Sequence, residues 1–592
     1  MHRAGSLLGV AGVAGSGATR GISRAYNFAS GMVSTLMKVP TRVGKRAHDA
    51  ARHYRQAGFW RGRSLGAELA DTCVRRGEAA ALLEGDRVLS FAALHDRVRA
   101  LAAGLGAAGI GPGDAVAYQL PNWWEATVTL LATVSLGARS IPIVPILRAR
   151  EVGMILAETR PRVVVVPGRH RRADYVPLFQ AAYEESGLGT EAAPLLVVAR
   201  AEKEPKGGTT FEALLESGAA APVPIAGAEV DPGDVAVVIY TSGSTAAPKG
   251  AMHSHETLGA ELRSLGAVHP LGDADRVLMP SPVTHISGVV HAILAPALLG
   301  TSAVLMDQWQ PARALELIER HRVTYMIGAP TFLQEMLAQP DLERHDLSSL
   351  RLFSCGGASV PAELMRVARA RLPGLVTKRV YGSSEFPTIS TTDAHDAVTR
   401  GLDTEGRALP GVEIRICDED GRRLPPRQEG EIRARGPDCF LGYVDARLDA
   451  ETFDAEGFLR TGDLGVLDED GYLTVTGRAK DIIVRKGEKI SAREVEDLIA
   501  THPAVAEVAV VPVGDAETGE RACACIRLAP GAEAPSLESL VDFLRERDLT
   551  PQKLPERLVV RDDLPRAPSG KVHKKLLREE VERHLAEGRP GR

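Results

Sequence analysis

The sequence predicts an α/β fold for most of the chain and a smaller, different architecture towards its C-terminus. Between residues 88 and 168, short β-branched segments such as VAYQLPN at 116–122 and RVVVVPG at 162–168 alternate with apolar helical segments. This alternation favours a parallel sheet that helices cover on both faces. Residues 201–233 are rich in Gly, Ala and Pro, and they are interpreted as a linker to a second unit of the same kind.

The pattern changes from about residue 400. Short strands with turn signals, such as GVEIRICDEDG and GYLTVTG, are closer to a small β-barrel. A compact α+β segment follows Gly477, where SARE at 491–494 has the form of a capping box. We therefore expect residues 54–477 to form a large N-terminal domain of two α/β subdomains and a small β-barrel. Residues 478–585 are expected to form a small α+β C-terminal domain.

Bulk composition excludes several classes of function. The 592 residues carry a net charge of −5 and only 4% aromatic residues, so we expect no nucleic-acid partner. No apolar run is long enough to span a membrane, which takes about 18 residues or more. The six cysteines are scattered without a CxxC pair, which is typical of free thiols and predicts a cytoplasmic location.

The first residues differ from the rest. Seven basic residues precede the first acid, Asp49, so residues 1–53 are expected to be a basic, disordered extension. LLGVAGVAG in this stretch is similar to a weak signal-peptide core, and a start at Met32 or Met37 is a further alternative.

A loop at residues 240–250, YTSGSTAAPKG, follows DVAVVIY, whose length and β-branched content predict a buried strand. Backbone N–H groups in a tight glycine loop form an anion-binding nest, and hydroxyls with one lysine around it suit a polyphosphate. The loop is not a Walker A motif, because it lacks the GxxxxGK[ST] spacing. Taken alone, it could also be a solvated turn with a surface lysine.

Other motifs follow the loop at consistent spacing. They are YGSSEFP at 381–387, GEIRARGPDCFLGY at 430–443, RTGDLG at 460–465, GRAKDIIVRKGEKISAREVE at 477–496 and PSGKVHKK at 568–575. In this order they resemble the signature motifs of the adenylate-forming superfamily, which contains acyl-CoA synthetases and adenylation domains. The tract at 477–499 looks most like the branch with cyclohexanecarboxylate- and medium-chain acyl-CoA ligases. The resemblance covers roughly residues 60–580.

The resemblance implies a two-step reaction that uses ATP, Mg²⁺ and CoA. A carboxylate first attacks the α-phosphate of ATP and releases pyrophosphate, and a thiol then displaces AMP from the acyl-adenylate. The same likeness implies that the small C-terminal domain is mobile.

The resemblance also assigns the nucleotide site. Glu385 is expected to bind Mg²⁺, since a hard cation prefers carboxylate and phosphate oxygens. Asp463 would accept the ribose hydroxyls, and Arg478 would assist at the ribose and phosphates. Tyr381 would lie against adenine, and Ser384 would bond the α-phosphate. The remaining expected contacts to ATP or AMP are Thr241, Ser242, Gly243, Ser244, Thr245, Lys249 and Gly357. Ala246 departs from the family pattern, where a glycine is usual.

Three further assignments concern the C-terminal domain. Lys571 resembles the adenylation lysine, whose ammonium would bridge the carboxylate and the α-phosphate in the transition state. Lys480 stands at the family's hinge position between two domain poses. Lys486 and Gly487 match the segment that lines the path of the CoA thiol arm.

PSPVTHISG at 280–288 resembles the border of the family's acyl pocket. His285 would lie near the carboxylate, and Ile286 replaces the asparagine of the dihydroxybenzoate and salicylate activators. Small or apolar residues elsewhere would complete the pocket, namely Ile327, Gly328, Cys355 and Gly356. Such a pocket suits a medium-chain, alicyclic or aryl acid.

The leading hypothesis is a ligase that joins an apolar carboxylic acid to CoA. A stand-alone adenylation enzyme that loads an acyl-carrier protein shares every ATP motif and is the first alternative. A non-catalytic nucleotide-binding regulator is the second, and retention of both Lys571 and Glu385 argues against it.

Overall fold

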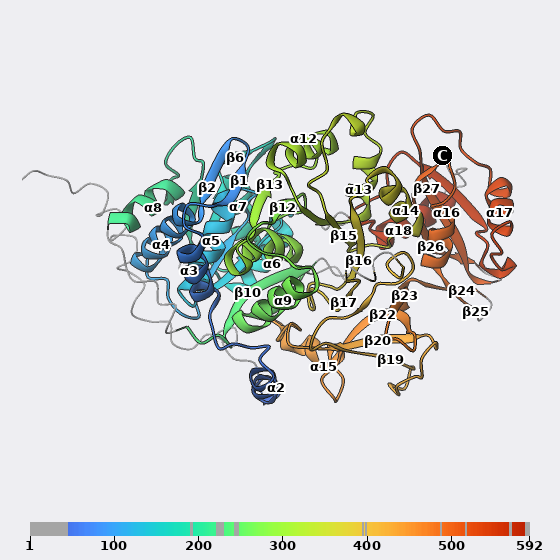
Figure 1. The fold of residues 1–592 in the computed structure, drawn as a ribbon, viewed down its shortest axis with the longest axis horizontal. Coiled ribbons are helices and arrows are strands. Elements are labelled where there is room, and N and C mark those ends of the chain that lie inside the picture. Colours follow the sequence, from blue (N-terminus) through green and yellow to red (C-terminus); the bar gives the residue numbers. More distant parts are fainter. Residues whose placement is uncertain are drawn as a thin grey trace, which may run out of the picture.

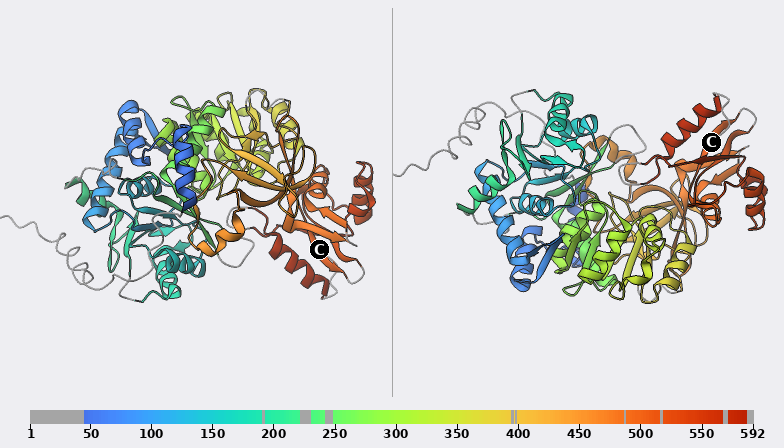
Figure 2. Two further views of the ribbon diagram at one scale, coloured as in Figure 1. Left: turned by 90° about the horizontal axis from the view of Figure 1, so that it is seen from below. Right: turned by 90° about the horizontal axis from the view of Figure 1, so that it is seen from above.

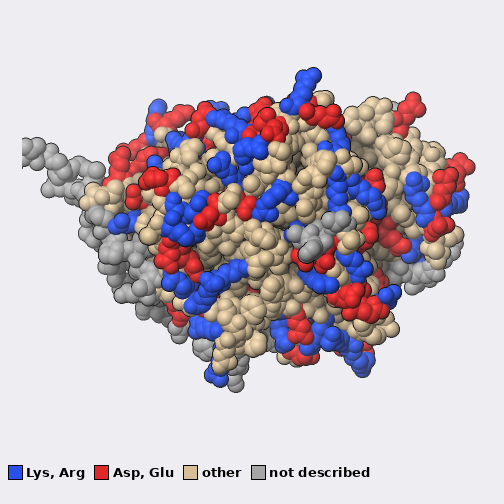
Figure 3. Space-filling view, viewed as in Figure 1, with Lys and Arg blue, Asp and Glu red and all other residues tan. Residues whose placement is uncertain are grey.

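A computed structural model describes residues 45–189, 193–220, 230–241, 248–393, 396, 399–485, 488–515, 518–566 and 571–586. Four main β-sheets organise these residues, and a two-stranded ribbon of β6 (Arg169–His170) and β7 (Ala173–Asp174) lies apart from them. None of the described helices is long and apolar enough to cross a membrane. Lys, Arg, Asp and Glu are interspersed over the face seen in Figure 3, so no patch of a single sign covers that face.

The first large sheet has eight strands in the order β21-β11-β10-β4-β3-β5-β8-β9. Its inner strands are parallel and fully buried, which explains their continuous apolar runs. The strands are β3 (Ala115–Tyr118), β4 (Arg139–Pro142), β5 (Val163–Pro167), β8 (Leu195–Ala199), β9 (Gly208–Thr210), β10 (Val235–Thr241), β11 (Lys249–Ser254) and β21 (Gly442–Tyr443).

The second large sheet has nine strands in the order β18-β17-β16-β15-β14-β12-β13-β1-β2. Its centre is parallel, as expected for the second α/β unit. The expected division differs at its edge, because β10 pairs with β4 in the first sheet, whereas β1 and β2 join this one. The strands are β1 (Ala80–Glu84), β2 (Arg87–Ser90), β12 (Arg276–Met279), β13 (Ser302–Leu305), β14 (Tyr325–Gly328), β15 (Leu352–Gly356), β16 (Val376–Tyr381), β17 (Ser390–Thr391) and β18 (Arg407–Ala408).

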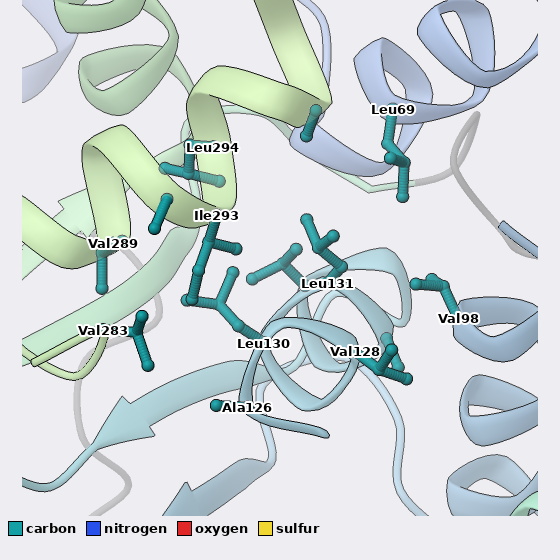
Figure 4. Close-up of a cluster of buried hydrophobic side chains, with 14 of the residues drawn as sticks. Leu69, Val98, Ala126, Val128, Leu130, Leu131, Val283, Val289, Ile293 and Leu294 are labelled. Atoms are coloured by element: carbon teal, nitrogen blue, oxygen red, sulfur yellow. The ribbon is translucent and has the colours of Figure 1, made fainter. Parts of the chain in front are cut away.

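Helices pack between and outside these two sheets (Figure 1). The central layer is apolar on all sides: Leu130 and Leu131 of α5 meet Ile293 and Leu294 of the π-helical turn η2 (Figure 4). The helices of this part are α3 (Leu65–Arg76), α4 (Phe91–Ala107), α5 (Trp124–Ser135), α6 (Ala149–Thr159), α7 (Tyr175–Ser186), α8 (Phe211–Ala220), α9 (His255–Val268), α10 (Ile286–Gly288), η2 (Val289–Leu294), α11 (Ala295–Leu299), α12 (Pro311–His321), α13 (Pro330–Leu337) and α14 (Ala362–Arg371).

Two local expectations differ from the structure. The stretch interpreted as a linker contains β9 and α8, because Phe211 and Leu214 are buried and Gly218 lets α8 approach the backbone of α4 at Ala100. The expected N-terminal extension also ends in a helix, α2 (Lys45–Gln56). The helix end is fixed because Arg55 pairs with the buried carboxylate of Glu256 at 2.9 Å.

The segment after residue 400 forms a four-stranded antiparallel sheet where a small β-barrel was expected. Its strands are β19 (Glu413–Cys417), β20 (Gly430–Arg435), β22 (Leu459–Leu467) and β23 (Leu473–Arg478), in the order β19-β20-β22-β23. The helix α15 (Asp449–Thr452) lies in the connection before β22.

The last part of the chain has its own sheet and core, and it lies at one end of the molecule (Figure 2). The turn η5 (Ala479–Asp481) links it to β23. The predicted cap is confirmed, since the Ser491 side chain accepts from the Glu494 amide at the start of α16. The elements are β24 (Ile482–Arg485), β25 (Glu488–Ser491), α16 (Ala492–Ile499), β26 (Val505–Asp515), β27 (Gly519–Leu528), α17 (Leu537–Arg545), β28 (Arg557–Arg561) and α18 (Lys574–Ala586).

Candidate active site

The predicted strand before the glycine-rich loop is confirmed as β10, and the structure adds a second strand, β11, after the loop. β10 and β11 are antiparallel, and Thr241 is paired with Lys249 across the base of the loop. The loop residues Ser242, Gly243, Ser244, Thr245 and Ala246 lie outside the described residues. Lys249 stands at the end of the loop. Its Nζ is 5.7 Å from the centroid of the Tyr443 ring, close enough for a cation–π contact.

Glu385 is held by a neighbouring segment of the chain. The Tyr443 hydroxyl donates to Glu385 Oε1 at 2.6 Å, and the Phe440 amide donates to the Glu385 carbonyl at 2.8 Å. The strand β21, which carries Tyr443, pairs with β11, so this contact also joins Glu385 to the exit of the glycine-rich loop. Burial lowers the pKa of His253 to about 4, and the neutral ring donates through Nε2 to the Ser384 carbonyl at 2.8 Å.

These contacts suit a cation ligand. Among the described residues, no lysine or arginine forms an ion pair with Glu385, although the charge of Lys571 interacts with this carboxylate. The described part of the chain also holds no cluster of three metal-ligating side chains. One carboxylate supplemented by phosphate oxygens is the usual way in which proteins hold Mg²⁺.

Asp463, Tyr381 and Arg478 form one hydrogen-bonded group. The Tyr381 hydroxyl donates to Asp463 Oδ2 at 2.8 Å, and Arg478 Nε lies 2.7 Å from Asp463 Oδ1. Asp463 faces Arg478 across the β22–β23 ladder, which explains why both side chains reach the same place. A carboxylate has about four acceptor positions, so Asp463 keeps room for the two hydroxyls of a ribose.

Lys571 reaches this group from the C-terminal part of the chain. A Cβ placed on Gly357, whose φ is +77°, would lie 3.7 Å from Lys571 Cε, an ordinary van der Waals distance, so the lysine side chain lies beside Gly357. The side chain keeps a solvent-accessible path, yet loss of hydration and the charge of Arg478 lower its pKa. The negative charges of Asp463 and Glu385 act in the opposite direction and raise the pKa of Lys571, so both carboxylates lie near its ammonium group.

His285 lies at the same junction. Loss of hydration, with a smaller effect from Lys571, lowers the pKa of His285 to about 4, so the ring is neutral at pH 7. Its Nδ1 is 3.1 Å from Ser287 Oγ, just before the short helix α10. A neutral imidazole beside an ammonium leaves one positive charge to meet a carboxylate.

The residues expected to line the acyl pocket divide between two faces of the large sheet. Ile286 and Ile327 belong to the central core. Gly356 is paired with Val380 in the β15–β16 ladder and lies on the same face of the sheet as Ile327. The side chain of Cys355 packs in the other core, against α13 and α14. The Cys355 side chain therefore lies on the face opposite that of Ile327, because neighbouring residues of a strand point to opposite faces. Gly328 lies beside Cys355 in the ladder and has a close neighbour in Phe332.

The structure adds contacts between the two parts of the chain that sequence reasoning missed. Arg493 of α16 pairs with Glu405 at 2.9 Å, and Glu405 also lies 3.4 Å from Arg379. Asp497, one turn later, accepts from the Ser359 hydroxyl at 2.6 Å. The partners of Arg493 and Asp497 lie 88 and 138 residues away in the chain, so no local pattern signals these two contacts. Lys480 is exposed in η5, while Lys486 and Gly487 lie outside the described residues.

Comparison with known proteins identifies the family. The model of the AMP-binding enzyme family matches residues 69–444, and that of its C-terminal domain matches residues 494–571. The chain belongs to the AMP-binding enzyme family.

Relatives of this AMP-binding enzyme include the medium-chain fatty-acid–CoA ligase of Escherichia coli (strain K12). The two are 36% identical over 537 residues, which is 90% of this chain and 93% of the relative. A second relative, from Rhodococcus jostii (strain RHA1), is named 3-[(3aS,4S,7aS)-7a-methyl-1,5-dioxo-octahydro-1H-inden-4-yl]propanoyl:CoA ligase. It is 34% identical over 509 residues, which is 85% of this chain and 96% of the relative.

A solved structure, ATP-bound MatB from Rhodopseudomonas palustris, matches with a TM-score of 0.76 and 30% identity over 88% of this chain and 99% of that one. The chain is thus an AMP-forming acid–thiol ligase with a large N-terminal and a small C-terminal domain. Ligases of that class use ATP and CoA as substrates and Mg²⁺ as the metal ion.

Proposed function

We propose that this enzyme converts an apolar carboxylic acid into its CoA thioester through an acyl-adenylate. The observation that supports this most directly is the position of Lys571 among Glu385, Asp463, Arg478 and His285. A single ammonium between a metal-binding carboxylate and a ribose-binding carboxylate suits the reaction of a carboxylate with the α-phosphate of ATP.

Each residue has a definite role in this proposal. Lys571 balances charge on the α-phosphate as the bond forms, and neutral His285 borders the carboxylate of the acid. Asp463 binds the ribose, with Tyr381 and Arg478 fixing its orientation. Bound Mg²⁺, held through Glu385, supplies charge neutralisation on the phosphates. Ser384, Thr241, Lys249 and the undescribed loop residues are proposed to complete the phosphate contacts.

The acid is proposed to be medium-chain, alicyclic or aryl. Ile286 and Ile327 are buried, and their apolar side chains would face the hydrocarbon part of the acid. The names of the two relatives, a medium-chain fatty-acid ligase and a ligase for a bicyclic propanoate, support the same class.

We further propose a domain boundary at residues 477–478, with Lys480 in the hinge. CoA is the proposed acceptor, with Lys486 and Gly487 along its thiol arm, and a carrier protein is the alternative acceptor. The six unpaired cysteines support a cytoplasmic location.

The contacts of Arg493 lead to a prediction about the two half-reactions, adenylation and thioester formation. Arg493→Ala removes the pair with Glu405, and we expect adenylation to slow by about tenfold, the usual scale for one charged hydrogen bond. Thioester formation from supplied acyl-AMP should stay unchanged, because the contact belongs to the pose with Lys571 in the site. Stopped-flow measurement of each half-reaction checks this, with exposed Arg545→Ala as the control. An equal loss in both steps would contradict it.

The proposed function is tested with Mg-ATP, CoA and a pool of alkyl, alicyclic and aryl acids, with products identified by mass spectrometry. We expect an acyl-CoA together with AMP from one of the three apolar classes. Acyl-AMP without acyl-CoA would replace CoA by a carrier protein as acceptor. Turnover of only polar or dicarboxylic acids added as a comparison set would overturn the substrate class.

A further inference from the structure

Two buried carboxyl groups lie in contact behind the candidate site. Glu261 belongs to α9, and Asp438 belongs to the loop between β20 and β21. Each residue is 1% exposed, and their side chains hydrogen-bond to one another. Apart from this contact, Glu261 Oε2 and both Asp438 oxygens lack a hydrogen-bond partner among the described residues.

The pair must share a proton to make that contact. Two carboxylates offer only acceptors, so one of the two groups has to be protonated and donate. Burial, the first cause, raises the pKa of Glu261 to about 7, and the pKa of Asp438 rises well above its usual range. The other titratable groups that face the pair are Tyr54, Tyr325 and Cys439, and burial raises the pKa of each, so all three are neutral at pH 7.

Hydrogen bonds lead from this pair to Glu385 along two segments. In the first, the Thr388 hydroxyl donates to Glu261 Oε1 at 2.7 Å, three residues after Glu385. In the second, Phe440 and Tyr443 follow Asp438 and bond the Glu385 carbonyl and carboxylate at 2.8 and 2.6 Å. The Glu261–Asp438 contact is therefore the place where these two segments are joined to each other and to α9.

We propose that Glu261 and Asp438 are positioning residues for adenylation, a carboxylic acid–carboxylate pair that fixes the two segments holding Glu385. The pair touches neither substrate nor metal and acts through the orientation of the Glu385 carboxylate. This inference rests on the proposed role of Glu385 and adds residues that no family motif singles out.

The side-chain chemistry provides a discriminating set of variants. Glu261→Gln keeps an acceptor for Thr388 and gains an N–H that donates to Asp438, so it preserves both contacts without a shared proton. Glu261→Leu has a similar shape and removes both contacts. Leu265→Ala, one turn further along α9 and 1% exposed, is a destabilising control that lies off the path.

The test measures acid-dependent ATP–pyrophosphate exchange of the full chain as a function of free Mg²⁺. We expect Glu261→Leu to raise the half-saturating Mg²⁺ concentration by about tenfold, the scale of a lost buried hydrogen bond. Glu261→Gln should stay within about threefold of the wild type, and Leu265→Ala should leave the Mg²⁺ dependence unchanged. Glu261→Leu behaving like Leu265→Ala, or Glu261→Gln behaving like Glu261→Leu, would overturn the proposal.

Two additions keep the test decisive. If Glu261→Leu does not fold, Thr388→Val against Thr388→Ser removes or keeps the hydroxyl to Glu261 and should reproduce the tenfold change. Glu385→Gln is measured alongside. If Glu385→Gln left the Mg²⁺ dependence unaltered, the role of Glu385 itself would be refuted. If Glu385→Gln altered the Mg²⁺ dependence but Thr388→Val did not, only the role of the Glu261–Asp438 pair would be refuted.

A separate readout follows the shared proton without any enzyme assay. The native state keeps a proton that the unfolded chain releases, so the pair's stability contribution is present below the unfolded pKa and declines as pH rises towards the folded pKa. The thermal midpoint of the wild type should therefore fall more than that of Glu261→Gln between about pH 5 and 7. Parallel pH profiles for the two proteins would contradict a shared proton.

Discussion

Replacement of Lys571 by alanine is expected to slow acyl-adenylate formation by about 10²–10³-fold, the usual effect of removing one preorganised donor from a transition state. Thioester formation from supplied acyl-AMP should stay within a few fold of the wild type. The reason is electrostatic: the charges of Asp463 and Glu385 act on Lys571, which is proposed to balance the charge that moves during adenylation, whereas the second step transfers an acyl group that is already activated. Single-turnover assays of the two half-reactions measure the difference.

The control for this variant is Lys575→Ala, which removes an exposed lysine from α18, close in sequence but away from the site. It should leave both half-reactions unchanged. Equal losses in the two steps of Lys571→Ala would show that the lysine acts through stability or nucleotide affinity in general, and would refute its assignment to adenylation.

The pH dependence of the same step has a definite sign. Since the pKa of Lys571 is lowered, its ammonium is lost at a lower pH than that of an ordinary lysine. The value of kcat/KM for ATP reports the free enzyme, so its adenylation profile should fall on the alkaline side before an ordinary lysine would titrate. Lys571→Arg should move that fall to higher pH, because a guanidinium stays charged. An unshifted alkaline limb in Lys571→Arg would mean that another group titrates.

Glu385→Gln is expected to lower the rate of adenylation at fixed Mg²⁺ by about 10²-fold and to raise the Mg²⁺ concentration required. The amide keeps the size of the side chain and can still accept from Tyr443, so the loop should hold its shape while the charge disappears. Titration with Mg²⁺ in the exchange assay separates lost metal affinity from lost folding, which circular dichroism would reveal.

A matched control for Glu385→Gln is Glu363→Gln, an exposed carboxylate at the start of α14 in the same domain. Its Mg²⁺ dependence should equal that of the wild type. If Glu385→Gln showed the same Mg²⁺ dependence as this control, the metal would have to be held elsewhere.

Periodicity and turn chemistry predicted those strands and helices whose formation depends on the local sequence. VAVVIY of the DVAVVIY run is buried in β10, as its β-branched content indicated, and Ser491 caps α16 through the amide that the SARE pattern specified. The interpretation of 201–233 as a linker was wrong because composition there reflects close helix packing: Gly218 faces the backbone at Ala100. Composition cannot distinguish a glycine that permits contact from one that permits flexibility.

The candidate site was predictable where its residues lie in motifs with fixed spacing, and less so elsewhere. Asp463 and Arg478 were both singled out, and the β22–β23 ladder accounts for their ion pair. Tyr443 was part of a quoted motif, yet its bond to Glu385 depends on the pairing of β21 with β11, strands about 190 residues apart in the chain. The direction of Cys355 depends on strand register, which the apolar run RLFSCGG does not define.

The sequence by itself determined the order of most elements, the family and the candidate residues for ATP binding, because these follow from local patterns and from motifs at fixed spacing. Only the tertiary structure decided which distant side chains meet. The charge of Lys571 interacts with those of Asp463 and Glu385, Arg493 pairs with Glu405, and the buried carboxyl groups of Glu261 and Asp438 act on one another. Such contacts depend on how whole domains pack and on the need of buried polar groups for hydrogen-bond partners. Neither can be predicted from the residues next to them in the sequence.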